Sequence, residues 1–319
     1  MAISRQASAP VFHHIGLLHD SPASYTRGCV TFIREGLDAG APVLVAVPGG
    51  GKNEAIRDAL GDADHRLQFA DMSIAGRNPG RILPWILLEF ADRHPGQRVW
   101  LISESMWPDR SCMEYQECAA HDAMINLAFT GRDAAILCPF DTVALRPQTI
   151  ADAHRTHPTL ADGVNTWRNS AYADPVDAAR DFDLPIPHPP GDAYRCSVAD
   201  RGDLRGLRQT VTAQATAANV APQRVRQLAI AVNELACNSI LHADGHASLS
   251  LWSEPGVFVC QIDDAGTWPD PMAGRVPRPA GSTGGYGLLI VHELADLVRV
   301  HSHQTGTSIR LHINLPNQR

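Results

Sequence analysis

An acid and an amide lie one helical turn apart in residues 231–242. Glu234 and Asn238 are four positions apart, and side chains at this spacing share one face of a helix. The carbonyl oxygen of Asn can bind Mg²⁺, and a Glu carboxylate can orient a water or accept a hydroxyl proton. The pair therefore suits phosphoryl transfer. The same spacing is also common on exposed helices without any chemical role, so the pair alone does not decide.

Further segments downstream offer groups that a nucleotide needs. Asp264 and Gly266 follow the strand-like run 257–263, and an Asp at a strand end can accept a hydrogen bond from a base amine. A glycine-rich turn at 281–287 leads into an apolar helical run, which leaves backbone N–H groups for phosphate oxygens. Residues 305–307, Thr-Gly-Thr, open a last alternating strand. These segments in this order indicate a nucleotide site.

Residues 195–315 resemble the ATP-binding domain of the histidine-kinase/Hsp90-type (GHKL) superfamily. They look most like its compact branch, the RsbW-like anti-sigma-factor serine kinases of bacteria. The resemblance implies that Glu234 is the catalytic base, that Asn238 is the Mg²⁺ ligand, and that Asp264 binds adenine. It also implies that ATP contacts a further set: Gly266, Gly285, Gly287, Leu288 and Thr307.

The stretch departs from that family at two places. Ser239 stands where the family usually has Ala, a small change that we expect to be harmless. The lid over ATP, residues 268–283, carries four prolines, which should make it stiffer than a lid of glycines. Arg275 and Arg278 lie in this lid. Both are candidates to contact the γ-phosphate, and the alternative is that both are solvated.

Length and composition favour two domains in a chain that neither spans a membrane nor binds nucleic acid. The 319 residues exceed one typical domain, and the net charge of −7 with a pI near 6.1 argues against a nucleic-acid surface. No apolar stretch reaches the roughly 18–20 residues of a membrane span. The first ten residues lack the apolar core of a signal peptide. The seven cysteines form no Cys-x-x-Cys motif, which predicts free thiols and a cytoplasmic location.

The first half alternates strand-like and helix-like segments, which predicts an α/β fold with a mostly parallel sheet covered on both faces. The expected helices include residues 21–39, 81–94 and 111–130. The second half reads as two helices, 204–218 and 222–242, with a strand at 194–198 and four more at 247–252, 257–263, 297–302 and 307–314. We expect these strands to form a mixed sheet in an α/β sandwich. The predicted division is a sensory domain at 8–165, a proline-rich linker at 166–192, and an ATP-binding domain at 193–316.

The first half also resembles a known module, the MEDS sensory domain, in four short segments. These are residues 12–19, 102–105, 138–141 and 154–158. The resemblance implies a RecA-like fold that has lost its nucleotide chemistry and that senses an unknown small ligand. Together, the two halves look like the RsbA-family anti-sigma regulatory proteins.

One glycine-rich loop in this half imitates a phosphate-binding loop. Residues 48–53 follow a strand and precede a helix, but the eight-residue frame begins with Ala46 in place of Gly and ends with Asn53 in place of Ser or Thr. The hydroxyl that would hold Mg²⁺ is therefore missing. A plain turn with Lys52 on the surface is the better interpretation.

Five side chains of the sensory half are candidates for its ligand site: His14, Glu104, Cys138, His154 and His157. We expect them to converge at the carboxyl ends of the parallel strands, where open α/β folds bind ligands. Histidine and cysteine also suit zinc or another transition metal. A site for a small ligand or a partner, a metal site, and a purely structural role all remain open here.

The function that these features favour is an ATP-dependent serine/threonine protein kinase that works as a sensory anti-sigma regulator. Its substrate would be a STAS-type anti-anti-sigma factor, with a sigma factor as a second partner, and the family resemblance implies a homodimer. One alternative is a non-catalytic switch whose binding of a partner depends on ATP. Another is an atypical histidine kinase, for which His292-Glu293-Leu294 resembles a phosphoacceptor box.

Overall fold

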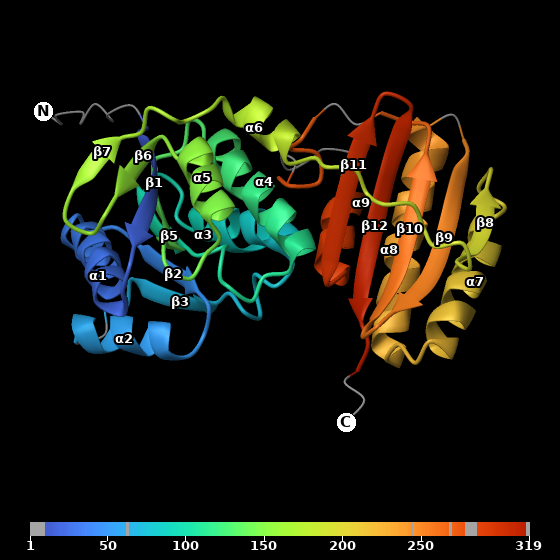
Figure 1. Ribbon diagram of the computed structural model, residues 1–319, viewed down its shortest axis with the longest axis horizontal. Helices are drawn as coiled ribbons and strands as arrows, with labels where there is room; N and C mark the ends of the chain where they lie inside the picture. Colours follow the sequence, from blue (N-terminus) through green and yellow to red (C-terminus); the bar gives the residue numbers. More distant parts are fainter. Residues whose placement is uncertain (1–9, 62–63, 244, 268–269, 278–285, 317–319) are drawn as a thin grey trace, which may run out of the picture. The chain divides into compact units, whose positions relative to one another are not determined.

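The computed structural model describes residues 10–61, 64–243, 245–267, 270–277 and 286–316. The chain divides into two compact units (Figure 1). Unit 1 consists of Met1–Ile74, Leu87–Asp109 and Asp122–Pro175, and unit 2 consists of Ala75–Ile86, Arg110–His121 and Val176–Arg319. Two short segments from the first half of the sequence therefore belong to unit 2.

Unit 1 is built on a seven-stranded sheet in the order β3-β2-β4-β5-β1-β6-β7. All neighbouring strands run parallel except β6 and β7. The interior strand β2 is buried along its whole length, as expected for a sheet covered on both faces. The predicted parallel α/β fold is confirmed. The strands are β1 (Phe12–His19), β2 (Val43–Val47), β3 (Leu67–Asp71), β4 (Val99–Ser103), β5 (Ala134–Asp141), β6 (Thr159–Ala161) and β7 (Thr166–Arg168).

Local sequence explains where the first helix begins. Ser21 and Ser24 form a reciprocal capping box, and Pro22 occupies the first turn, where its missing N–H costs nothing. The helices of the first half are α1 (Pro22–Asp38), α2 (Gly51–Leu60), α3 (Glu89–Asp92), α4 (Cys112–Ala128) and α5 (Pro147–Thr156).

The expected helix at 81–94 is not continuous. It is a 3₁₀ turn at Pro79–Arg81, a π-helical stretch at Leu83–Leu88 and the short α3. Pro84 lies inside the π-helical stretch, and a proline cannot donate the i→i−4 hydrogen bond of an α-helix. The prediction of one long α-helix was therefore wrong.

Unit 2 contains a five-stranded sheet in the order β11-β12-β10-β9-β8, and every neighbouring pair is antiparallel. The expectation of a mixed sheet was wrong. The crossover through α9 does make β10 and β11 parallel, but β12 lies between them. The elements are α6 (Pro175–Asp181), β8 (Tyr194–Val198), α7 (Leu204–Ala217), α8 (Pro222–His242), β9 (Ala247–Glu254), β10 (Val257–Asp264), α9 (Gly287–Leu294), β11 (Leu297–His303) and β12 (Gly306–Asn314).

The core of unit 2 lies between its helices and one face of the sheet. Phe258, Cys260 and Ile262 of β10 face this core, together with Leu228 and Leu235 of α8. Side chains alternate between the two faces along a strand. The neighbours Asp263 and Asp264 therefore point to opposite sides of the sheet.

The predicted linker, 166–192, is more ordered than an extended spacer. It contains β7 and α6, and residues 183–190 lie along β11 and β12. The Asp183 carboxylate lies 2.8 Å from the His301 ring, and Arg299 and Arg310 donate to the carbonyl oxygens of Leu184 and Pro187. The proline-rich segment is thus fastened to the sheet of unit 2 by hydrogen bonds.

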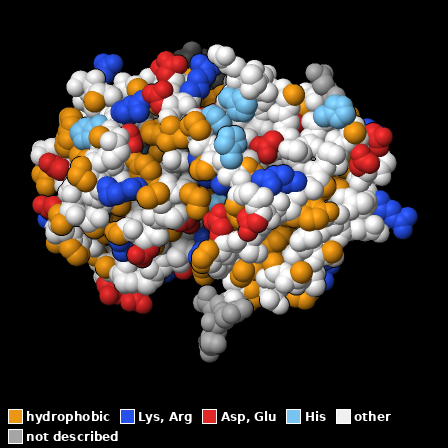
Figure 2. Space-filling view, turned by 45° about the vertical axis from the view of Figure 1, so that its right-hand side comes forward, with side chains coloured by type: hydrophobic (Ala, Val, Ile, Leu, Met, Phe, Trp, Pro, Cys, Tyr) orange, Lys and Arg blue, Asp and Glu red, His pale blue; other side chains and the backbone are white. Residues whose placement is uncertain are grey.

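The visible surface mixes charges of both signs. Lys and Arg side chains are interspersed with Asp and Glu on the face shown in Figure 2. Within the described part of the chain, no helix combines the length and the apolar character that crossing a membrane requires.

A buried histidine on β12 should make the stability of unit 2 depend on pH. Burial, the largest cause, lowers the pKa of His312 to about 4, with Glu254 opposing the shift and Arg310 adding to it. The folded state therefore prefers the neutral ring. The contribution of His312 is complete above pH 6.5, the ordinary pKa, and falls as the pH drops toward 4.

We expect the free energy of unfolding to fall by about 2 kcal/mol between pH 7 and pH 5 on account of this ring. Urea unfolding of the full chain at both pH values measures it. His312→Gln should remove this part of the pH dependence, whereas His303→Gln, at an exposed position, should keep it. An unchanged pH dependence in His312→Gln would contradict the assignment.

Candidate functional site

Helix α8 presents Glu234 and Asn238 on the face away from its buried side. Its buried residues include Val225, Leu228 and Val232, as the helical periodicity predicts. Glu234 and Asn238 are both half-buried. The two side chains that sequence reasoning paired are thus placed together at a partly accessible position.

The start of α9 lies directly against this pair. A Cβ atom built on Gly287, the first residue of α9, would lie 3.1 Å from Glu234 Oε2 and 3.5 Å from Asn238 Nδ2. The first backbone N–H groups of a helix have no partner within the helix and favour an anion. A phosphate group placed here would meet the helix start, the carboxylate and the amide together.

Asp264, at the end of β10, is held by two hydrogen bonds. The Ser239 hydroxyl donates to Oδ2 at 2.5 Å, and the backbone N–H of Gly266 donates to Oδ1 at 2.9 Å. Each carboxylate oxygen has a second lone pair. Asp264 therefore keeps the capacity to accept a hydrogen bond from a base amine.

The role of Ser239 was missed by sequence reasoning, which treated it as a harmless replacement for Ala. Ser239 is buried, and a buried hydroxyl needs a hydrogen-bond partner. Its place one residue after Asn238 puts it on the inward side of α8, next to the strand that ends at Asp264. The hydroxyl also lies 3.2 Å from the carbonyl oxygen of Leu235 in its own helix, so the sequence carried no signal that pointed to Asp264.

A tight backbone corner encloses Asp264. Thr307 pairs with Asp264 in the sheet register, and its hydroxyl donates to the carbonyl oxygen of Gly266 at 2.7 Å. A Cβ atom on Gly306 would lie only 2.2 Å from the Asp264 carbonyl oxygen. Glycine is therefore required at 306, and the structure brings the predicted Gly266 and Thr307 together at Asp264.

The other predicted contacts of ATP divide into three cases. Leu288 is buried in the core of unit 2. Arg275 is buried and forms an ion pair with Glu117, so the alternative of a solvated lid residue was wrong, and its contact with the γ-phosphate stays a prediction. Arg278 and Gly285 lie outside the described residues.

His292 of α9 is enclosed by residues of segment 75–86. The Asn78 amide donates to the carbonyl oxygens of His292 and Ala295 at 2.7 and 3.1 Å, which satisfies groups that a helix end leaves unpaired. A Cβ atom on Gly80 would overlap the His292 ring. The ring is completely buried, and burial lowers its pKa well below the usual value, with Arg275 adding to the effect.

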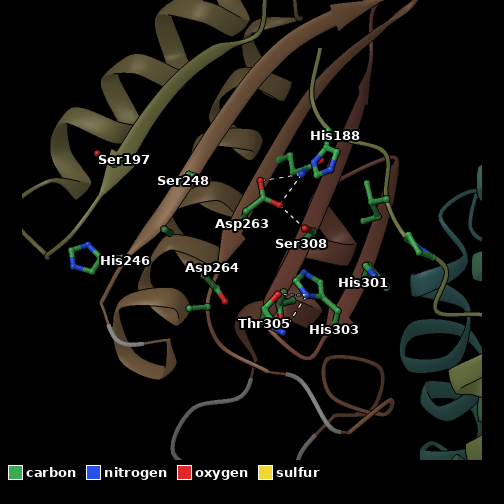
Figure 3. Close-up of a pocket in the computed structure, with 16 residues that line it drawn as sticks. His188, Ser197, His246, Ser248, Asp263, Asp264, His301, His303, Thr305 and Ser308 are labelled. Carbon is green, nitrogen blue, oxygen red and sulfur yellow. Dashed lines mark hydrogen bonds between the residues drawn. The ribbon is translucent and has the colours of Figure 1, made fainter. Parts of the chain in front are cut away.

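An open cavity of about 780 Å³ lies on the other face of the unit 2 sheet (Figure 3). Its lining includes Asp263, His188 and Ser308, and it reaches Asp264 at the strand end. The Ser308 hydroxyl donates to Asp263 at 2.5 Å. Glu234 and Asn238 do not line this cavity.

Among the five sensory candidates of unit 1, the structure brings three together. The side-chain ligand atoms of His14, Cys138 and His157 all lie within 4.8 Å of one another, and all three residues are buried. The register aligns Gly16 of β1 with Cys138 of β5, so the group lies in the middle of the sheet. The expectation that it would lie at the carboxyl ends of the strands was wrong.

The remaining two sensory candidates lie elsewhere. Glu104, buried after the end of β4, accepts a hydrogen bond from the Tyr25 hydroxyl at 3.0 Å and forms an ion pair with Lys52. Burial raises the pKa of Glu104, and the Lys52 ammonium opposes this. Lys52 is therefore a partner of a buried carboxylate and not a free surface lysine. His154 is half-buried on α5.

Comparison with known proteins identifies both halves of the chain. Residues 13–158 match the MEDS family, the methanogen/methylotroph DcmR sensory domain, and residues 197–313 match the histidine kinase-like ATPase domain. The chain thus carries a MEDS domain followed by an ATPase domain of the histidine kinase type, as predicted. No curated protein matches it.

Solved structures show a partial likeness to this chain. One of them, the crystal structure of the RsbU and RsbW domains of Rv1364c from Mycobacterium tuberculosis, is 16% identical, with a TM-score of 0.29. The match covers 40% of this chain and 33% of that one.

Proposed function

We propose that this chain is an ATP-dependent serine/threonine protein kinase that regulates a sigma factor through a STAS-type anti-anti-sigma partner. The observation that carries the proposal is the close approach of Glu234 and Asn238 to Gly287 at the start of α9. It brings a carboxylate, an amide and a helix N-terminus together, and these groups can serve as base, Mg²⁺ ligand and phosphate-binding site in phosphoryl transfer.

The residues present fit Mg-ATP. Asn238 would offer its carbonyl oxygen to Mg²⁺, the N–H groups at the start of α9 would donate to phosphate oxygens, and Asp264 would accept from the adenine amine. ATP, when bound, supplies the γ-phosphate. Glu234 then accepts the proton of the attacking serine or threonine hydroxyl.

The position of His292 argues against the histidine-kinase alternative, which rested on the resemblance of His292-Glu293-Leu294 to a phosphoacceptor box. A phosphoacceptor must reach the γ-phosphate, whereas His292 is completely buried. The ATP-gated switch would use the same residues to bind the nucleotide but needs no general base. The role of Glu234 therefore distinguishes the kinase from the switch.

A homodimer formed through the face of the unit 2 sheet opposite its helices would have to accommodate residues 183–190, which are hydrogen-bonded to β11 and β12.

The direct test is incubation of the full chain with Mg²⁺, ATP labelled at the γ-phosphate, and candidate STAS-type proteins. We expect the label on a serine or threonine of one such partner, located by mass spectrometry. Label on a histidine of this chain would support the histidine kinase. ATP-dependent binding of a partner without any transfer would support the switch.

Replacing Lys52 should leave ATP binding unchanged. Lys52 is paired with Glu104, and Asn53 supplies no hydroxyl for Mg²⁺. Calorimetric titration of Lys52→Ala with Mg-ATP should give the wild-type affinity within about twofold. A tenfold loss would instead identify unit 1 as a second nucleotide site.

A further inference from the structure

We propose that unit 1 holds a site for one zinc-type divalent ion, bound by His14, Cys138 and His157. The three residues come from β1, from β5 and from the end of α5. They are 1%, 1% and 0% exposed. Two imidazoles and a thiol are the donors that zinc and its late first-row neighbours prefer, while Mg²⁺ and Ca²⁺ prefer oxygen ligands.

The hydrogen bonds of His157 leave one ring nitrogen available to an ion. Its Nδ1 lies 2.9 Å from the carbonyl oxygen of Ala153. A carbonyl can only accept, so Nδ1 carries the proton and Nε2 carries the lone pair. This Nε2 is buried and has no hydrogen-bond partner among the described residues. Metal-binding histidines usually donate their other ring N–H to a carbonyl or carboxylate in this way.

Asn126 fixes the ring of His14 in the same manner. The Asn126 amide nitrogen donates to the carbonyl oxygen of Thr156 at 2.8 Å, so its Oδ1 is the atom that faces His14 Nδ1, at 3.0 Å. Nδ1 of His14 must then donate to Oδ1. The lone pair of His14 is therefore on Nε2, which lies 3.4 Å from Cys138 Sγ.

The spacing suits tetrahedral coordination. Zinc bonds to nitrogen and sulfur in tetrahedral geometry imply an N–S separation of about 3.5 Å, close to the distance between His14 and Cys138. All three ligand atoms lie within 4.8 Å, so small inward rotations complete the group. Gly16 makes room, because a Cβ atom there would lie 3.2 Å from the His157 ring.

The group is bordered by an aromatic ring and would leave a bound ion one coordination position for another donor. The Phe140 ring packs edge-on against His157 at 5.1 Å, so the wall there is apolar. Binding breaks the Cys138 S–H bond, forms the ion–sulfur bond and releases one proton to solvent. Three protein ligands leave a fourth position, as in open zinc sites. A small exogenous donor at that position would give unit 1 a chemical signal to sense.

The test measures metal in the full chain purified from zinc-supplemented growth. We expect about one zinc per chain in the wild type, and at least a tenfold lower content in Cys138→Ser and in His157→Gln. Cys29→Ser is the matched control. Its thiol is also buried in unit 1 but lies outside the group, so it should retain the zinc of the wild type.

A second measurement needs no substitution at the site. The wild-type chain grown with Co²⁺ should show the visible bands of tetrahedral cobalt and a sulfur-to-cobalt charge-transfer band, the latter absent in Cys138→Ser. A folded wild-type chain that holds neither zinc nor cobalt would overturn the proposal, and the three residues would then form a buried hydrogen-bonded group. Equal zinc content in wild type and Cys138→Ser would overturn it as well.

Discussion

Replacing Glu234 with Gln is expected to abolish phosphate transfer while ATP binding stays nearly unchanged. The amide keeps the shape of the side chain next to Gly287 but cannot accept the hydroxyl proton. A general base contributes about 10²- to 10⁴-fold to the rate, so the loss is visible in a simple transfer assay to a STAS-type partner. Calorimetry with Mg-ATP measures the binding in parallel.

Two further variants make the result specific. Glu254→Gln carries the same change at an exposed position of unit 2 and should transfer phosphate at the wild-type rate. Asn238→Ala should instead lose both Mg²⁺ and tight nucleotide binding. Equal transfer by the wild type and Glu234→Gln would show that the assigned base is wrong.

Asp264→Asn should weaken ATP binding by about tenfold or more. The substitution replaces a charged acceptor, and a hydrogen bond to a charged group contributes about 1.5–3 kcal/mol. The bond from the Ser239 hydroxyl can persist to the amide oxygen, so the fold should be retained. Calorimetric titration of the full chain with Mg-ATP gives the affinity, and circular dichroism checks the fold.

The neighbouring residue supplies the control. Asp263→Asn makes the same chemical change one position earlier, on the opposite face of β10, where Asp263 accepts from Ser308 and Gln261. It should bind ATP with the wild-type affinity. If both variants, or neither, lose affinity, Asp264 is not the specific acceptor of the base amine.

Elements of the site could be predicted where residues close in the sequence determine the secondary structure. The helix expected at 222–242 is α8, because Pro222 defines its first turn and the apolar residues recur with helical spacing. The strand order was not predictable in the same way. Inserting β12 between β10 and β11 pairs residues far apart in the chain, and no local pattern reports that pairing.

The sequence indicated which residues could form a site, but not where in the fold they lie or which side chains they contact. Histidine and cysteine in unit 1 indicated a metal or ligand site, but its depth in the sheet depends on the register that aligns Gly16 with Cys138. The contact of Ser239 with Asp264 likewise joins a helix and a strand 25 positions apart. Both required the tertiary structure.

Segments 75–86 and 110–121 belong to unit 2, and this limits where the chain can be divided to make a fragment or a fusion protein. A fragment that begins at the predicted boundary near residue 193 would lack Asn78 and Glu117. The last carbonyl groups of α9 would lose their donor, and the Arg275 guanidinium would lose the carboxylate that neutralises it. An uncompensated buried charge destabilises a fold strongly. We therefore expect that the ATPase half does not fold stably by itself, and that a fusion of it to another sensor domain must include these two segments.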